Sequence, residues 1–218
     1  MNLNRIYVFT AMNKEGGHYF DLLRSARKYG WPLQAHYIPA EEVDDVLFSK
    51  SYNRWMNTKH LIIRGIIEEA MKKGFEKFVY VDGWDCLFTG PMEELPWYNL
   101  LHFGVEGPGA YPEEGYTEFF PKEGGINAGV IWGTCAAYMQ MCPTYEGFDQ
   151  LLWHRAYANS QQGYWLDLYR KVVVNLFGIN AGDTWTYQGG RIGYNPTKSR
   201  PLILHANGKW SFPSFLLK

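Results

Sequence analysis

The chain has 218 residues, of which 46% are hydrophobic and 20% charged, so it can bury a full core and is not an intrinsically disordered protein. Its formal net charge of −1 gives no overall basic field of the kind that attracts nucleic acid, although local basic patches stay open. The three cysteines lack paired metal-binding spacing and predict reduced thiols. No apolar run reaches membrane-spanning length and no leader-like segment opens the chain, which predicts a cytoplasmic protein.

The first hundred residues alternate between strand-like and helix-like segments. Short apolar runs predict strands at 6–9, 33–38 and 78–81. Apolar residues at helical spacing predict helices at about 20–29 and at 59–73, each followed by a glycine of the kind that ends helices. This alternation predicts an α/β fold with a mainly parallel sheet that helices cover on both faces.

The rest of the chain is less regular, because Pro, Gly, Glu and aromatic residues interrupt it. We expect one domain over residues 1–218, with a nucleotide-binding half at 1–100 and an acceptor-side half at 101–218. The elements expected in the second half are long loops at 91–125, a strand at 125–133, a helical region with a break at 138–174 and a final strand that begins near 201.

Two carboxylates follow the strand at 78–81 directly. Asp82 would leave the strand first, and a tight turn through Gly83 would bring Asp85 back beside it. Ligands of α/β proteins bind past the carboxyl ends of the strands, and paired carboxylates suit Mg²⁺ or Mn²⁺ that also holds phosphates. Trp84, between them, would offer a flat face to a base. The alternative is an ordinary acidic turn after a strand.

Four motifs carry a resemblance to a known family, the glycosyltransferases of the GT-A fold, and most closely to the collagen glycosyltransferase domain of the multifunctional lysyl hydroxylases. The family's V-A-T opening strand is similar to residues 8–11, and its V-D-S-Y-D to 81–85. Its L-N-S-G-G-F-I-G resembles residues 126–133, and its closing V-H-G-N-G resembles 204–208. All four occur in the same order at comparable separations, so the resemblance implies a GT-A type fold over nearly the whole chain.

The resemblance implies that Asp82, Asp85 and His205 bind a Mn²⁺ that bridges the two phosphates of a UDP-sugar. A divalent ion stabilises the charge that develops on a diphosphate leaving group. An imidazole beside two carboxylates favours Mn²⁺, with Mg²⁺ as the alternative ion. Without the resemblance, His205 would be read as a histidine that ends a strand.

The family also implies where the nucleotide lies. Trp84 stands in place of a tyrosine that stacks on uracil, and Thr10 ends the first strand at the uridine edge. Lys59, at the start of the helix expected at 59–73, and Lys209, after the Gly208 turn, would reach the diphosphate. The alternatives are a threonine in a plain strand-to-loop turn and two solvated surface lysines.

Three residues are implied for the sugar and the chemistry. Glu106 resembles a family glutamate that faces the sugar after a strand, and Asn127 would donate to a sugar or acceptor hydroxyl. Asp183, with Gln188, resembles a downstream D…F-Q pair whose role is less defined. Glu106 and Asn127 could instead cap backbone groups in a loop.

One departure concerns the catalytic base. The family has an acidic D-D-D-Q run before its late helix, whereas the sequence at 159–162 is Asn-Ser-Gln-Gln, where Gln162 alone matches. Asp167 follows five residues later and need not point the same way. The base, the donor sugar and the stereochemical outcome are therefore left open.

The expected function is metal-dependent transfer of a sugar from a UDP-sugar to a hydroxyl acceptor, which is a protein, a glycan or a hydroxymethylated DNA base. The last acceptor would suit a viral enzyme acting in its host cell, with local basic residues at 24–28 or 191–200 as a DNA track. Residues 108–123, with Tyr111 and Tyr116, are expected to form the acceptor wall. The alternatives are a non-catalytic nucleotide-sugar binding module and, third, a metal-dependent phosphohydrolase.

Overall fold

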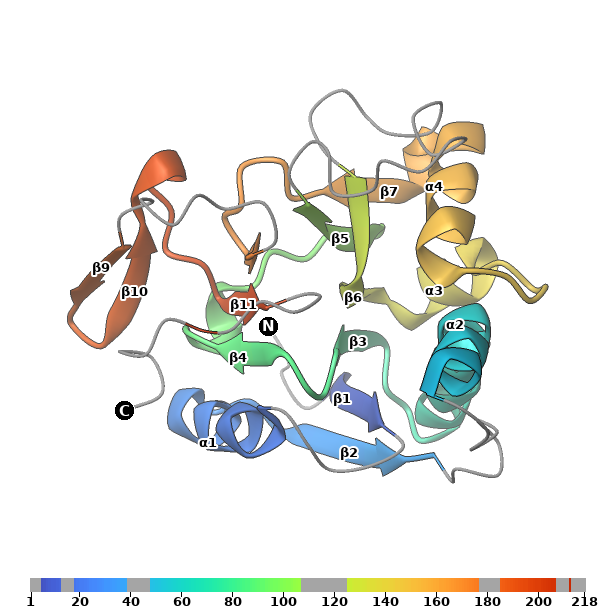
Figure 1. Cartoon of the computed structure of the whole chain (residues 1–218), viewed down its shortest axis with the longest axis horizontal. Helices are drawn as coiled ribbons and strands as arrows, with labels where there is room; N and C mark the ends of the chain where they lie inside the picture. The colour runs from blue at the N-terminus through green and yellow to red at the C-terminus, as the bar shows by residue number, and fades with distance from the viewer. Residues whose placement is uncertain are drawn as a thin grey trace.

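A six-stranded sheet forms the centre of the molecule, in the order β2-β1-β3-β6-β5-β7 (Figure 1). Five strands run in one direction and only β6 is antiparallel to its neighbours β3 and β5. The computed structural model describes residues 5–12, 18–38, 48–106, 125–176, 185–206 and 212, without the side chains of 48–54. The strands are β1 Ile6–Met12, β2 Leu33–Tyr37, β3 Lys77–Val81, β5 Leu101–Glu106, β6 Gly125–Thr134 and β7 Tyr164–Leu166.

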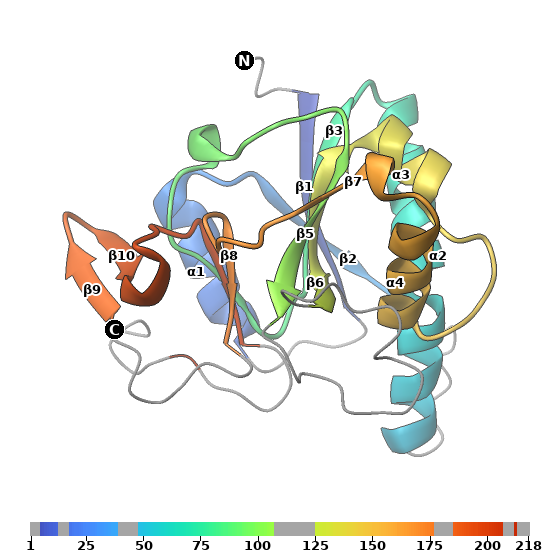
Figure 2. The same cartoon turned by 90° about the horizontal axis from the view of Figure 1, so that it is seen from above.

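Helices cover both faces of this sheet, as Figure 2 shows, with α1 on one side and α2, α3 and α4 on the other. Alternate strand residues make the two cores, because successive side chains of a strand point to opposite faces. Val8 and Val79 pack with Leu22 of α1, whereas Phe9 and Phe78 belong to the core that α2, α3 and α4 complete. The helices are α1 Tyr19–Tyr29, α2 Phe48–Lys72, α3 Cys135–Met141 and α4 Asp149–Asn159, with 3₁₀ turns at Met92–Glu94, Gln161–Gly163 and Asn195–Thr197.

A second, three-stranded sheet joins the end of the chain to its middle. β11 (Ile203–His205) lies between β4 (Cys86–Phe88), to which it is antiparallel, and β8 (Val173–Asn175), to which it is parallel. The hairpin of β9 (Trp185–Gln188) and β10 (Arg191–Tyr194) projects beside it (Figure 1). The three-stranded sheet therefore holds residue 205 next to the turn that follows β3.

The expected fold class is confirmed: the chain is α/β, with a mainly parallel sheet between helices. The glycines expected to end helices do so, since Gly30 follows α1 with φ +73° and Gly74 follows α2 with φ +87°. None of the helices described in the structure is both long enough and apolar enough to span a membrane.

Three expected elements are wrong in part. The helix expected from Lys59 begins at Phe48, so Lys59 lies in its middle. The region expected to be helical up to residue 174 ends its last helix at Asn159 and then forms β7 and β8, because aromatic and β-branched residues there favour strands. The stretch expected as loops contains β5, a central strand whose Gly104 lies at a register shift and obscures the pattern.

Candidate metal centre

The turn after β3 is fixed by hydrogen bonds of the main-chain groups of Asp82 and Asp85. The Asp82 N–H donates to the Gly129 carbonyl of β6 over 2.8 Å. The Asp85 carbonyl accepts from the Ala206 N–H over 2.7 Å, immediately after β11 ends. The sequence spaces Asp85 and His205 120 residues apart, and this bond brings their backbones together.

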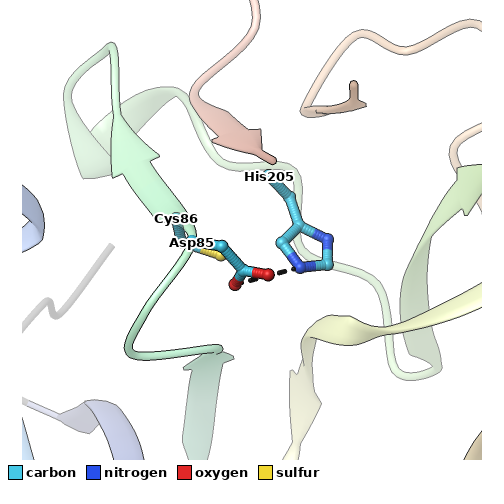
Figure 3. A group of neighbouring side chains, drawn as sticks. All are labelled: Asp85, Cys86 and His205. Carbon is cyan, nitrogen blue, oxygen red and sulfur yellow. Dashed lines mark ion pairs between the residues drawn. The ribbon is translucent and has the colours of Figure 1, made fainter. Parts of the chain in front are cut away.

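The imidazole of His205 faces both carboxylates. Its Nε2 lies 3.3 Å from Oδ1 of Asp85 and 3.7 Å from Oδ2 of Asp82, and its side chain is 2% exposed. Figure 3 shows the Asp85 carboxylate pointing at the ring. Nε2 of His205 and Oδ1 of Asp85 are both buried and make no hydrogen bond to the residues that the structure describes. Two carboxylates and an imidazole whose lone-pair atoms converge in this way fit a divalent cation.

The two oxygens of Asp82 have different surroundings. The Tyr80 hydroxyl donates to Oδ1, and the Lys59 ammonium lies 3.5 Å from the same oxygen. Only Oδ2 is turned toward His205. Tyr80 and Lys59 therefore orient Asp82 so that one of its oxygens is directed at the cluster.

The protonation of the cluster reflects burial and mutual charge. Burial raises the pKa of Asp82, and the negative charge of Asp85 raises it further. The positive charges of Lys59 and His205 oppose this shift but do not cancel it. Burial alone would also raise the pKa of Asp85, but His205 and Lys59 hold it below its ordinary value. Burial would lower the pKa of His205, yet the two carboxylates raise it. The three side chains thus shift one another's pKa values, as close buried charges do.

Lys59 is buried between two carboxylates and is not a solvated first-turn lysine. Its side chain is 3% exposed, and its ammonium lies 3.1 Å from Oδ2 of Asp149, whose side chain is 1% exposed. Burial alone would lower the pKa of Lys59, but Asp149 and Asp82 outweigh it and hold that pKa above its usual value. The ammonium stays charged and is the counter-ion of both carboxylates.

Asp149 was not singled out from the sequence. It opens α4, and the next residue, Gln150, makes an Asp-Gln pair at the start of a helix. This Asp-Gln pair is the signal that could have identified Asp149, because it matches the end of the family's D-D-D-Q run. That run was compared instead with residues 159–162, where Asn159 and Gln162 are exposed. Asp167 accepts the backbone N–H groups at 171–173 and so holds a turn before β8.

Gly129 makes room for the cluster where β6 passes it. A Cβ at this position would lie 2.2 Å from Cε1 of His205, 2.6 Å from its Nε2 and 2.8 Å from Oδ2 of Asp82. These distances are far below van der Waals contact, and the neighbours are fixed groups of the site. The chain thus requires a glycine here for a close approach.

Cys86 lies in the same cluster. One ligand atom each from Asp85, Cys86 and His205 lie within 4.8 Å of one another (Figure 3). Burial, together with the charges of Asp85 and Asp82, raises the pKa of the Cys86 thiol well above its ordinary value. Hard cations prefer carboxylate oxygen and imidazole nitrogen to sulfur, so the donor set that fits best is Asp82, Asp85 and His205.

The two residues expected at the sugar lie next to this cluster and contact each other. Nδ2 of Asn127 donates to Oε1 of Glu106, and Oδ1 of Asn127 accepts from the Gly129 N–H over 2.8 Å. Nε2 of Gln150 donates to the other Glu106 oxygen over 3.5 Å. Glu106 and Asn127 are 1% and 3% exposed, so both are held in a buried polar network. Asn127 also caps a backbone group, as the alternative interpretation stated.

The expected nucleotide edge is brought together as well. Thr10 is buried within β1, which continues to Met12. Its hydroxyl makes no hydrogen bond to the described part of the chain. The turn lies against it, because a Cβ on Gly83 would be 2.8 Å from the Thr10 oxygen. Trp84 is partly buried beside this contact, and its carbonyl accepts from the His18 N–H over 2.8 Å.

Of the expected residues still to be placed, the structure describes Gln188 alone. Gln188 is exposed on β9 of the hairpin. Asp183, Gly208 and Lys209 lie outside the described residues, as does the acceptor wall expected at 108–123.

Comparisons with known proteins agree with the fold. No protein-family model matches the chain, and no curated protein matches it. Among solved structures it is similar to the crystal structure of a glycosyltransferase involved in the glycosylation of the major capsid of PBCV-1, with 15% identity and a TM-score of 0.56 over 94% of each chain. This likeness shows that the chain has a glycosyltransferase fold.

Proposed function

We propose that this protein transfers a sugar from a UDP-sugar donor to a hydroxyl acceptor, with Mn²⁺ held by Asp82, Asp85 and His205. The observation that carries the proposal is the convergence of Oδ2 of Asp82, Oδ1 of Asp85 and Nε2 of His205 at the end of β3 in a glycosyltransferase fold. A divalent ion there would neutralise the charge of a diphosphate leaving group. The orphaned buried atoms of Asp85 and His205 support a cation as the missing partner.

The edge beside the cluster supports a nucleotide as the other ligand. The Thr10 hydroxyl, which has no hydrogen-bond partner among the described residues, lies against Gly83, and Trp84 is the next residue of the turn. A buried hydroxyl without a partner costs free energy, and a polar edge of a base or ribose would satisfy it. We assign Trp84 to stacking on the base. Lys59 would act on the diphosphate indirectly, because its ammonium orients Asp82.

The sugar side of the site retains carboxylates. Glu106 is held by Asn127 and Gln150, and Asp149 is held by Lys59. Such fixed groups can hold sugar hydroxyls in one geometry, as an enzyme that positions its substrate for transfer requires. The module was suggested by missing carboxylates at 159–162, and the presence of Asp149 at the site removes most of that reason.

A protein or a protein-bound glycan is the acceptor class that we favour. The similar solved structure is described as acting in the glycosylation of a capsid protein. The basic residues considered as a DNA track are partly engaged in ion pairs, Arg24 with Asp21 at 3.6 Å and Arg191 with Glu94 at 2.6 Å. Such pairing weakens their attraction for phosphates.

The experiment that tests the proposal is a screen of UDP-sugars for UDP release by the purified protein, with and without Mn²⁺. We expect at least one donor to be hydrolysed slowly in a Mn²⁺-dependent way, because water can replace the acceptor in such sites. Tight UDP binding without turnover of any donor would favour the binding module. Release of inorganic phosphate in place of UDP would indicate the phosphohydrolase.

Replacing Trp84 by Ala should weaken UDP binding by about 1–3 kcal/mol, the value of one aromatic stacking platform. Isothermal titration calorimetry with UDP and Mn²⁺ measures this. The matched control is Tyr187→Ala, which removes an aromatic ring that is 61% exposed on β9 and should leave UDP affinity unchanged. Equal affinities of wild type and Trp84→Ala would place the base elsewhere.

A further inference from the structure

Asn175 is the strand neighbour of His205. The two residues are register partners on the parallel strands β8 and β11, and the Leu176 N–H donates to the His205 carbonyl over 2.8 Å. Side chains of paired residues in adjacent strands project on the same face of a sheet. Asn175 is fully buried there, at the position from which it can reach the imidazole.

The amide of Asn175 contacts the ring nitrogen that faces away from the carboxylates. Its Oδ1 lies 2.7 Å from Nδ1 of His205. With the amide in this orientation its oxygen can only accept, so Nδ1 carries a hydrogen, and in a neutral imidazole the other nitrogen then has a free lone pair. That nitrogen is Nε2, which faces Asp82 and Asp85.

The opposite amide orientation would have the reverse effect. If the NH₂ group of Asn175 faced Nδ1, the ring hydrogen would move to Nε2 and would donate to Asp85 at 3.3 Å. Nε2 would then have no lone pair with which to bind a cation. The two orientations thus predict opposite behaviour in metal binding, although their shapes are the same.

We propose that Asn175 is a positioning residue whose side-chain oxygen holds His205 with Nε2 available to a divalent cation. Histidines that bind metals commonly donate their other ring N–H to an oxygen that fixes the tautomer and the ring plane. Gly104 leaves space for this amide, since a Cβ on Gly104 would lie 3.1 Å from Nδ2 of Asn175. The inference rests on the proposed function only in taking the cation to be Mn²⁺.

The test compares Asn175→Leu, which keeps the shape without the acceptor, with Asn175→Asp, which keeps an acceptor oxygen. Mn²⁺ affinity is measured from the electron paramagnetic resonance signal of the free ion. We expect Asn175→Leu to bind Mn²⁺ about 10- to 100-fold more weakly. Asn175→Asp should bind at least as tightly as wild type.

A control removes a comparable buried hydrogen bond from the same part of the molecule. Thr89→Val deletes the bond from the Thr89 hydroxyl to the Pro201 carbonyl, 2.7 Å long, beyond the other ends of β4 and β11. It should lower the melting temperature of the metal-free protein without changing Mn²⁺ affinity. Melting of each Asn175 variant is recorded in parallel, and Asn175→Ala replaces the leucine variant if that variant does not fold.

The outcomes separate this inference from the proposed function. Unchanged Mn²⁺ affinity in Asn175→Leu, or equal losses in the leucine and aspartate variants, would overturn the positioning role. Absence of Mn²⁺ binding by the wild type would overturn both. Mn²⁺ binding that depends on residue 175, in a protein that turns over no UDP-sugar, would support the positioning role and overturn the proposed function.

Discussion

Replacing Asp85 by Asn should lower Mn²⁺-dependent UDP release by about 1,000-fold or more, because a bound cation supplies several kcal/mol of charge stabilisation. His205→Ala should have a similar effect, since Nε2 of His205 and Oδ1 of Asp85 lie 3.3 Å apart and would share one ion. The rate of UDP release at saturating donor, with Mn²⁺ varied, is the measurement. Asp85→Asn is the cleaner variant, because His205 is buried and its truncation leaves a cavity.

Cys86→Ala is the matched control. Its thiol belongs to the same cluster, but sulfur is a soft donor that a hard cation disfavours, so the variant should retain normal Mn²⁺ dependence. A large loss in this variant would make Cys86 a ligand and would favour a softer metal than Mn²⁺. Normal metal dependence in Asp85→Asn would remove the metal assignment altogether.

Replacing Lys59 by Met should destabilise the metal-free protein by about 3–5 kcal/mol, because it leaves the buried carboxylate of Asp149 without its partner. Asp82 also loses its counter-ion, 3.5 Å away. Chemical denaturation of the metal-free protein measures the effect. The loss should shrink at saturating Mn²⁺, since the cation then compensates Asp82.

A control variant on α2 and a double variant that joins α2 and α4 test this explanation. Lys72→Met removes an exposed ion pair with Glu69 from the same helix and should leave stability unchanged. Lys59→Met combined with Asp149→Asn should recover much of the lost stability, because the unpaired charge is removed as well. If Lys59→Met is as stable as wild type, the ammonium does not balance these carboxylates.

The sequence predicted those parts of the site that lie at ends of strands. Asp82 and Asp85 follow an apolar run, so the pattern of a buried strand with a polar end pointed to them. His205 was assigned through the family resemblance, because on its own it reads as a histidine that ends a strand. The alternation of strands and helices predicted the fold class for the same reason. The predictions of the fold class and of the two aspartates depend on local periodicity, which the sequence shows directly.

Partners through space were not predictable in this way. Asn175 reaches His205 only because β8 pairs with β11, and the valines before it looked like the end of a helix. Asp149 matters because Lys59, from another helix, points at it. Lys59 itself was placed near a helix start, whereas the longer helix buries it.

The three-stranded sheet can be completed only after the six-stranded sheet, because β11 is synthesised last. All six strands of the main sheet are made before residue 167, whereas β11, the central strand of the three-stranded sheet, contains His205. The main sheet can therefore assemble while the chain is still being translated, before any cation can be captured. A chain that stops before β11 would keep its carboxylates at the turn but would expose the edges of β4 and β8, which invite pairing with other chains. If the proposed cation binds, its capture should require β11 to have been made, and a chain that stops before β11 should aggregate.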